Sequence, residues 1–82
     1  MKVTVNISLK EGVLDPQGRA VERSLASIGF SEASNVRIGK QITLDVEAED
    51  AGRAHQRVAR MCEQILANTV IEDYEITVEE DQ

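Results

Sequence analysis

Large aromatic side chains are nearly absent from this sequence, which has one Phe, one Tyr and no Trp in 82 residues. A core built without rings must rely on aliphatic side chains, and we expect it to be thin. Only one Cys is present, so no intrachain disulfide can form, and we expect a reducing, intracellular setting. Lys and Arg number 9 against 15 Asp and Glu, and the formal charge of -6 disfavours nucleic acid as a partner.

Long apolar runs are lacking as well. Residues 1–10 alternate in polarity instead of forming a signal peptide, and no run approaches the ~18 apolar residues of a membrane span. We therefore expect a cytoplasmic protein with no membrane contact. The length predicts a single domain, residues 1–82, and such a small chain buries only about 60% of its unfolded surface. Oligomerisation or docking is the expected further source of stability.

Alternating polarity predicts strands at both ends of the chain, over residues 3–9 and 74–78. The middle segment, residues 36–46, is open to several interpretations. A Gly39-Lys40 turn would place the two apolar sets on opposite faces, whereas a three-residue loop over 39–41 would keep them on one face. One long strand bent at Gly39 is the other interpretation.

Two helices are predicted between these strands. Asp15 can cap the first helix and Pro16 fits its first position, while Gly29 is placed to end it in a left-handed turn. Asp50 can cap the second helix, which Asn68 is expected to end in the same way. The apolar stripe of the first helix is Val21, Leu25 and Ile28; that of the second is Ala54, Val58, Met61 and Ile65, widened by Cys62 and Leu66.

The order of these elements predicts an α+β fold, an antiparallel sheet with two helices on one face. The arrangement is a ferredoxin-like β-α-β-β-α-β, or β-α-β-α-β if the middle strand is continuous. An RNA-recognition domain of this shape would need stacking aromatic residues on its central strands, and these strands have none.

Reactive side chains are sparse. His55 and Cys62 lie about two turns apart on the second helix, too far for a nucleophile and its base. No further His or Cys exists to complete a metal site. We predict a core role for Cys62 and a surface role for His55, and we interpret the acidic groups around Glu49 and Glu72 as solvated edges. We therefore expect no catalytic, cofactor-binding or metal-binding residues.

Several residues without an evident core role are candidates for a subunit interface. The plain interpretation is that Val13 and Leu14 tuck under the first helix, and that Arg37 and Lys40 belong to a solvated turn. The functional interpretation is a docking surface. The interface candidates are Val13, Leu14, Pro16, Gly18, Arg37, Gly39, Lys40 and Asn68.

Three stretches resemble a known family. GVLDPQG at 12–18, RIGK at 37–40 and the CEQILAN-x-VIEDY block at 62–74 are similar to PurS, the small subunit of phosphoribosylformylglycinamidine (FGAM) synthase. The similarity runs from about Val3 to Val78. Family members often carry proline where this chain has Thr69, which loosens the turn after the second helix by a modest entropy term.

The resemblance implies a role in de novo purine biosynthesis. In that family's ligase complex a glutaminase, PurQ, releases ammonia, and a synthetase, PurL, uses ATP and Mg²⁺ to activate the substrate amide. The resemblance implies that this chain binds between them as a homodimer or homotetramer and has no catalytic residues of its own. The alternative, from another class, is a ferredoxin-like domain that senses a small molecule at a protomer interface.

Overall fold

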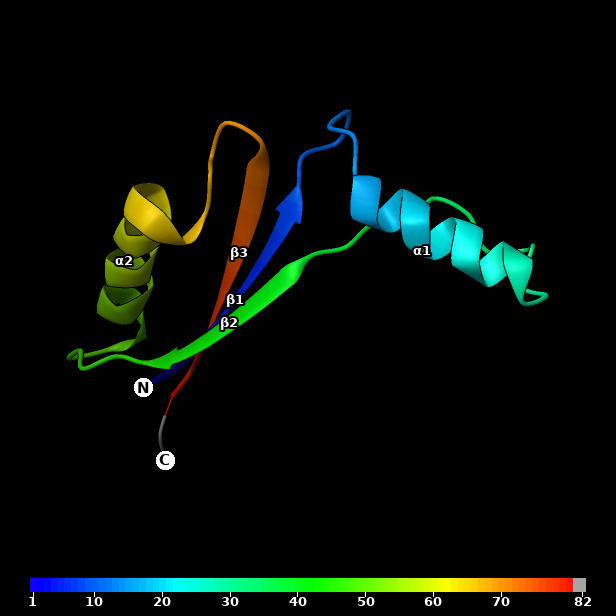
Figure 1. Ribbon diagram of the computed structural model, residues 1–82. Helices are drawn as coiled ribbons and strands as arrows, with labels where there is room; N and C mark the ends of the chain where they lie inside the picture. Colours follow the sequence, from blue (N-terminus) through cyan, green and yellow to red (C-terminus); the bar gives the residue numbers. More distant parts are fainter. Residues whose placement is uncertain (81–82) are drawn as a thin grey trace.

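The computed structural model describes residues 1–80 and contains a three-stranded sheet with two α-helices and a π-helical turn (Figure 1). Strand β1 lies in the centre and pairs antiparallel with both neighbours, in the order β2-β1-β3. The predicted α+β class and antiparallel sheet are confirmed. The elements are β1 Lys2–Leu9, α1 Pro16–Ser27, β2 Lys40–Asp45, α2 Ala51–Met61, η1 Cys62–Leu66 and β3 Glu72–Glu79.

The middle segment forms a single short strand, Lys40–Asp45, so neither the hairpin nor one long strand bent at Gly39 is found. The order of elements is β-α-β-α-β rather than β-α-β-β-α-β. Residues 36–39 lie outside the sheet and form no hairpin arm with β2. Val36 N donates instead to Glu22 Oε1 at 3.2 Å, and Ile38 N donates to Asp15 Oδ2 at 2.7 Å. Because each amide has one proton to donate, side chains from α1 and its cap have replaced the hairpin partner.

The core lies between one face of the sheet and α2, which packs against β1 and β3. Burial alternates along β1, as the sequence predicts. The part of this face on β2 is less well covered, and Ile42 and Leu44 remain partly exposed. The core is aliphatic apart from Cys62, and its members are Val3, Val5, Ile7, Val46, Ala54, Val58, Cys62 and Ala67.

Helix α1 lies beyond the end of the sheet instead of on its face, so α2 alone of the two helices covers the sheet (Figure 1). The apolar stripe of α1 is consequently exposed: Val21 is 40% exposed and Ile28 is 69% exposed. Phe30, just after the helix, is 50% exposed. The radius of gyration is 16.2 Å, against about 12 Å for a compact domain of this length. The expectation that both helices share one face fails because α1 has no sheet beneath it in its own chain.

The second helix begins as predicted and ends differently. Asp50 Oδ1 accepts from Arg53 N at 2.8 Å, the expected cap. The last turn widens into the π-helix η1, and Ala67 N donates to Cys62 O at 3.1 Å. Ala67 is extended, so the predicted left-handed turn at Asn68 does not form. Ile65, predicted to be in the apolar stripe, is 80% exposed.

Helix α1 begins against the segment that leads into β2. Asp15 caps it, as predicted, and Gly18 lies so close to this segment that an added Cβ would be 2.1 Å from Val36 O. The obstacle is backbone, which cannot rotate away as a side chain can. Glycine at position 18 is therefore what allows the two segments to touch.

Replacing Gly18 with alanine tests this contact. We expect Gly18→Ala to lower the free energy of unfolding by about 1–3 kcal/mol, because the added methyl group forces the helix start and Val36 apart. Urea denaturation followed by circular dichroism measures the change. Gly52→Ala in α2 is the matched control: its nearest neighbour is the Asp50 side chain at 3.3 Å, and we expect equal or higher stability. Equal free energies of unfolding for Gly18→Ala and Gly52→Ala would contradict the close packing at Gly18.

Candidate functional site

The carboxylate of Asp15 joins two segments that are far apart in sequence. Asp15 Oδ1 accepts from Gly18 N at 2.8 Å within the first turn of α1, and Oδ2 accepts from Ile38 N at 2.7 Å. Asp15 is only 5% exposed. The amides of Ile38 and Gly18 hold the pKa of this carboxyl below its ordinary value, because both hydrogen bonds favour the charged form.

Arg37 fixes the loop between β1 and α1. Its Nη1 donates to Val13 O at 2.7 Å, and its Nη2 donates to Lys10 O at 3.1 Å. A guanidinium presents several donors in a rigid fork, so one side chain holds two carbonyls of the loop at once. Arg37 is exposed, so the predicted solvated turn is found, and its side chain also holds the preceding loop.

Glu72 connects β2 with the turn before β3. Its Oε1 accepts from Asn68 N at 2.7 Å, while its Oε2 lies 3.6 Å from Lys40 Nζ. Gly39 precedes this ion pair, and a Cβ there would be 2.8 Å from Ile7 O, so the chain passes close to β1 at this point. The Lys40 side chain is 58% exposed, as expected for a solvated turn, whereas the Glu72 side chain is only 14% exposed and is not a solvated edge.

These contacts gather the interface candidates at one end of the sheet. We call the surface formed by residues 10–18, 36–40 and 68–72 the junction surface; Lys10 N donates to Ile71 O at 2.8 Å and joins its first and last segments. Seven candidates lie in its first two segments, and Asn68 joins them through Glu72. Those seven are Val13, Leu14, Pro16, Gly18, Arg37, Gly39 and Lys40.

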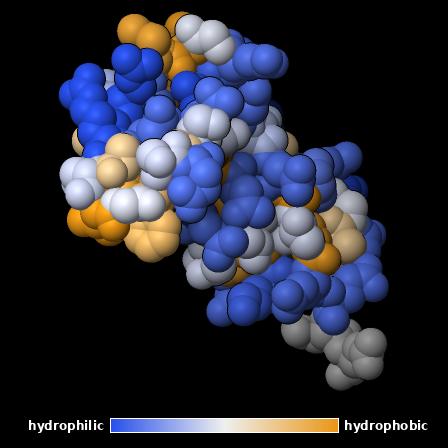
Figure 2. Space-filling view, turned by 90° about the vertical axis from the view of Figure 1, so that its right-hand side faces the viewer, coloured by the Kyte–Doolittle hydropathy of each residue, from blue (hydrophilic) through white to orange (hydrophobic). Residues whose placement is uncertain are grey.

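Apolar side chains protrude from the junction surface. Leu14 is 83% exposed and Val70 is 81% exposed, so the interpretation that Leu14 tucks under the first helix is wrong. Figure 2 shows apolar side chains at the top of the face, level with the two loops of Figure 1. A rigidly held loop that displays an exposed leucine is suited to fill a pocket on another protein.

The potentially reactive side chains outside the junction surface are Cys62, Tyr74 and His55. Burial raises the pKa of the Cys62 thiol, and the charge of Glu63 adds to the effect, so the reactive thiolate is disfavoured. Tyr74 Oη donates to Glu63 Oε2 at 2.8 Å, which raises the pKa of the tyrosine. Cys62 is fully buried and His55 lies exposed on α2, as predicted. Within residues 1–80 no group of three His, Cys, Asp or Glu is arranged to hold a metal ion.

Two residues that hold these segments, Glu72 in the junction surface and Glu22 in α1, are not among the interface candidates from the sequence. Glu72 shares the parity of Tyr74, Ile76 and Val78, and this inward parity was the available signal for its partial burial. Glu22, which accepts from Val36 N, gave no signal, because that hydrogen bond joins segments 14 residues apart.

The comparisons with known proteins agree with this architecture. The family model PurS, described as phosphoribosylformylglycinamidine (FGAM) synthase, matches residues 2–80. The PurS subunit of Bacillus subtilis is 53% identical over 79 residues, covering 96% of this chain and 93% of that protein. The chain belongs to the PurS family.

Solved PurS structures share the fold. The crystal structure of PurS from Methanocaldococcus jannaschii, one of the subunits of formylglycinamide ribonucleotide amidotransferase, aligns with a TM-score of 0.90 at 43% identity, covering 99% of this chain and 98% of that one. A chain in the structure of PurLQS from Thermotoga maritima aligns with a TM-score of 0.85 at 36% identity, covering 93% of each chain. No helix in residues 1–80 has the length and apolar character to cross a membrane.

The lowered pKa of Asp15 makes stability depend on pH in a defined direction. A carboxyl whose pKa is lower in the folded state contributes stability above its unfolded value of 3.8, and this contribution is lost as the pH falls through the folded pKa. Asp15→Asn leaves an amide N–H₂ facing a backbone N–H. We expect the variant to unfold about 4–8 °C lower near neutral pH.

Thermal unfolding from pH 7 to pH 2 measures this effect. The difference between wild type and Asp15→Asn is expected to be constant above about pH 5 and to shrink below that, because protonated Asp15 resembles asparagine. Asp73→Asn, at an exposed position of β3, is the matched control and should follow the wild type. A difference that persists unchanged at pH 2 would contradict the role of the charged carboxylate.

Proposed function

We propose that this chain is a non-catalytic bridging subunit of a phosphoribosylformylglycinamidine synthase complex in de novo purine biosynthesis, where it joins a glutaminase to a synthetase. The similarity to PurS subunits over nearly the whole length carries the proposal. The PurLQS structure supports the identity of the partners, because a PurS-like chain occurs there in a complex of that name. This favours bridging over sensing of a small molecule.

The physical need for such a bridge comes from ammonia. Ammonia released into water is protonated and loses the lone pair that attacks the activated amide, so transfer requires a route sheltered from solvent. A rigid subunit can hold the two large subunits in register. In this proposal ATP, Mg²⁺ and glutamine act in the larger subunits, this chain binds none of them, and the complex works in the cytoplasm.

The junction surface is the proposed contact with a large subunit. Its loop is fixed by Arg37 and Asp15, so little conformational entropy is lost when Leu14 enters a pocket. Exposed apolar side chains on both loops supply area that gains from burial.

Reconstitution tests the bridging role. Without this chain, we expect the cognate synthetase and glutaminase to lose most glutamine-dependent turnover while the ammonia-dependent rate of the synthetase changes little. Leu14→Asp should restore at least about tenfold less activity than the wild type at limiting concentration, because it places a charge at the contact. Thr43→Asp, on the exposed side of β2, should restore activity fully. Efficient use of glutamine without this chain would overturn the proposal.

We propose further that the chain is a homodimer or homotetramer in which α1 of one protomer covers a second copy. The stripe of α1 is exposed, and the β2 part of the sheet face that α2 leaves partly uncovered carries Ile42 and Leu44. In a ferredoxin-like arrangement a second helix covers this part of the sheet, so α1 of another protomer is the natural occupant.

Substitution on α1 tests the self-association. Ile28→Asp should lower the molar mass measured by size exclusion with light scattering, because an unpaired carboxylate would be buried in the contact. Ser24→Asp, an exposed residue of the same helix, should keep the wild-type mass. A wild-type molar mass for the Ile28→Asp variant would exclude α1 from the subunit contact.

A further inference from the structure

Strand β2 lies at an edge of the sheet and directs half of its backbone groups away from the sheet. Met1 N donates to Val46 O at 2.8 Å, and Val46 N donates to Met1 O at 2.9 Å. Opposite residues in an antiparallel ladder alternate between pairs that exchange both hydrogen bonds and pairs that exchange none. In the observed register, Gln41, Thr43 and Asp45 therefore direct their backbone N–H and C=O groups toward the free edge.

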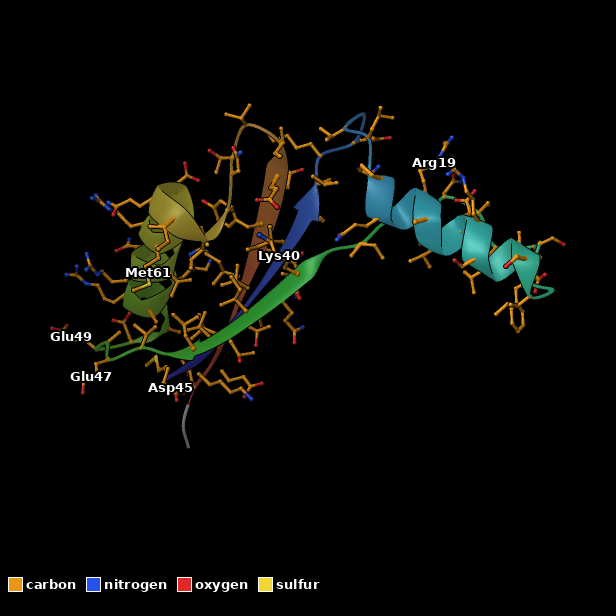
Figure 3. All side chains as sticks on the ribbon, viewed as in Figure 1. Arg19, Lys40, Asp45, Glu47, Glu49 and Met61 are labelled. Carbon is orange, nitrogen blue, oxygen red and sulfur yellow. The ribbon has the colours of Figure 1, made fainter. Side chains whose placement is uncertain are left out.

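The two edges of the sheet differ in charge. Four of the eight residues of β3 are acidic, so a second copy at that edge would bring carboxylates together. Strand β2 carries Lys40 at one end and Asp45 at the other (Figure 3), and between them the apolar Ile42 and Leu44 are only partly buried. The β2 edge is therefore the one suited to receive another strand.

Helix α1 and the segment that follows it form one body. Glu22 Oε1 accepts from Val36 N at 3.2 Å, and Asp15 Oδ2 accepts from Ile38 N at 2.7 Å. Both acceptors belong to carboxylates, which make stronger hydrogen bonds than neutral groups. We call residues 15–38 the α1 body; it extends beyond the end of the sheet (Figure 1).

The α1 body has an edge that matches β2. Successive amides of an extended chain point to opposite sides, so the amide of Arg37 faces away from the carboxylates of α1. Antiparallel pairing of Arg37 with Thr43 of a second copy brings the apolar side chains of both segments to one face. The flanking pairs exchange no backbone bonds in this register, so the bonds within the α1 body are kept. The opposed apolar pairs are Val36 with Leu44 and Ile38 with Ile42.

This pairing does not occur within one chain. Gly39 continues past the end of β1 toward α1, and an added Cβ there would be 2.8 Å from Ile7 O (Figure 1). Four residues of extended chain, about 13 Å, separate Ile38 from Ile42. The free edge of β2 is therefore open to another copy.

We propose that the α1 body is exchanged between two copies of this chain, with residues 39–41 as the hinge. The inference deepens the self-association proposed above and rests on it. Each α1 body gives its partner a fourth strand beside β2 and a helix over Ile42 and Leu44, so two chains together complete two β-α-β-β-α-β units. A hinge that is free to reverse lets one chain make the same contacts with itself, as a closed monomer.

A designed disulfide tests the exchange. In the proposed pairing the Cα atoms of Ile38 and of Ile42 in the second copy are about 4.5 Å apart, within the span of a disulfide. On oxidation, Ile38→Cys/Ile42→Cys should give at least about tenfold more covalent dimer on a non-reducing gel than either single variant. The single variants are matched controls, because equivalent residues of the two copies lie about 13 Å apart in this register. Buried Cys62 is common to all three.

Light scattering of the wild type separates the outcomes of this test. An oligomeric wild type, without excess covalent dimer in the double variant, overturns the exchange and leaves the self-association standing. A wild type that stays monomeric overturns the self-association and this inference together. Glutamine-dependent turnover reports the bridging role independently of both.

Lengthening the hinge tests the closed form. A longer loop reverses the chain with less strain and disfavours swapping. Insertion of Gly-Ser between Gly39 and Lys40 should lower the molar mass at least about twofold, with unchanged helicity by circular dichroism. The same insertion between Ser31 and Glu32, at exposed positions after α1, should keep the wild-type mass. A wild-type mass or a loss of helicity in the hinge variant overturns the hinge assignment.

Discussion

The carboxylate of Asp15 is the interaction on which the rest of the molecule depends. It holds the first turn of α1 and the amide of Ile38 at the same time, and so sets where the chain leaves one element and enters the next. Gly18 permits the contact by having no Cβ, and Arg37 extends it to the preceding loop. An ordinary helix cap has thus become the junction between three segments. This polar junction, rather than the aliphatic core, gives the exposed loop its shape.

The features predictable from sequence were those fixed by near neighbours. The alternation in β1 and β3, the Asp15-Pro16 helix start and the Asp50 cap are read from a few adjacent residues, and each appears where it was predicted. Cys62 was placed correctly in the core, because it lies on the same helix face as Val58. Local patterns sufficed wherever the decisive contacts lay within one element.

Features that depend on distant segments were not accessible in this way. The stripe of α1 predicts burial, but no local signal says that α1 lies beyond the end of the sheet, where its own chain leaves the stripe exposed. The hairpin at Gly39 fails because Ile38 bonds to a carboxylate 23 residues earlier. The eight interface candidates did come together at one end of the fold, since seven of them flank the two segments that Asp15 joins. Their contacts with other subunits stay predictions.

The widened turn η1 shows how backbone pitch alters what a sequence displays. At regular α pitch Ile65 would sit at an angle between Ala54 and Val58, in the middle of the buried stripe. One additional residue in the turn swings it into solvent while Cys62 stays inside. The widened turn thereby places the apolar side chain of Ile65 on the surface without any change in composition. Deleting a single residue from this turn would rotate the residues that follow it by about 100° about the helix axis and leave the faces of α2 unchanged.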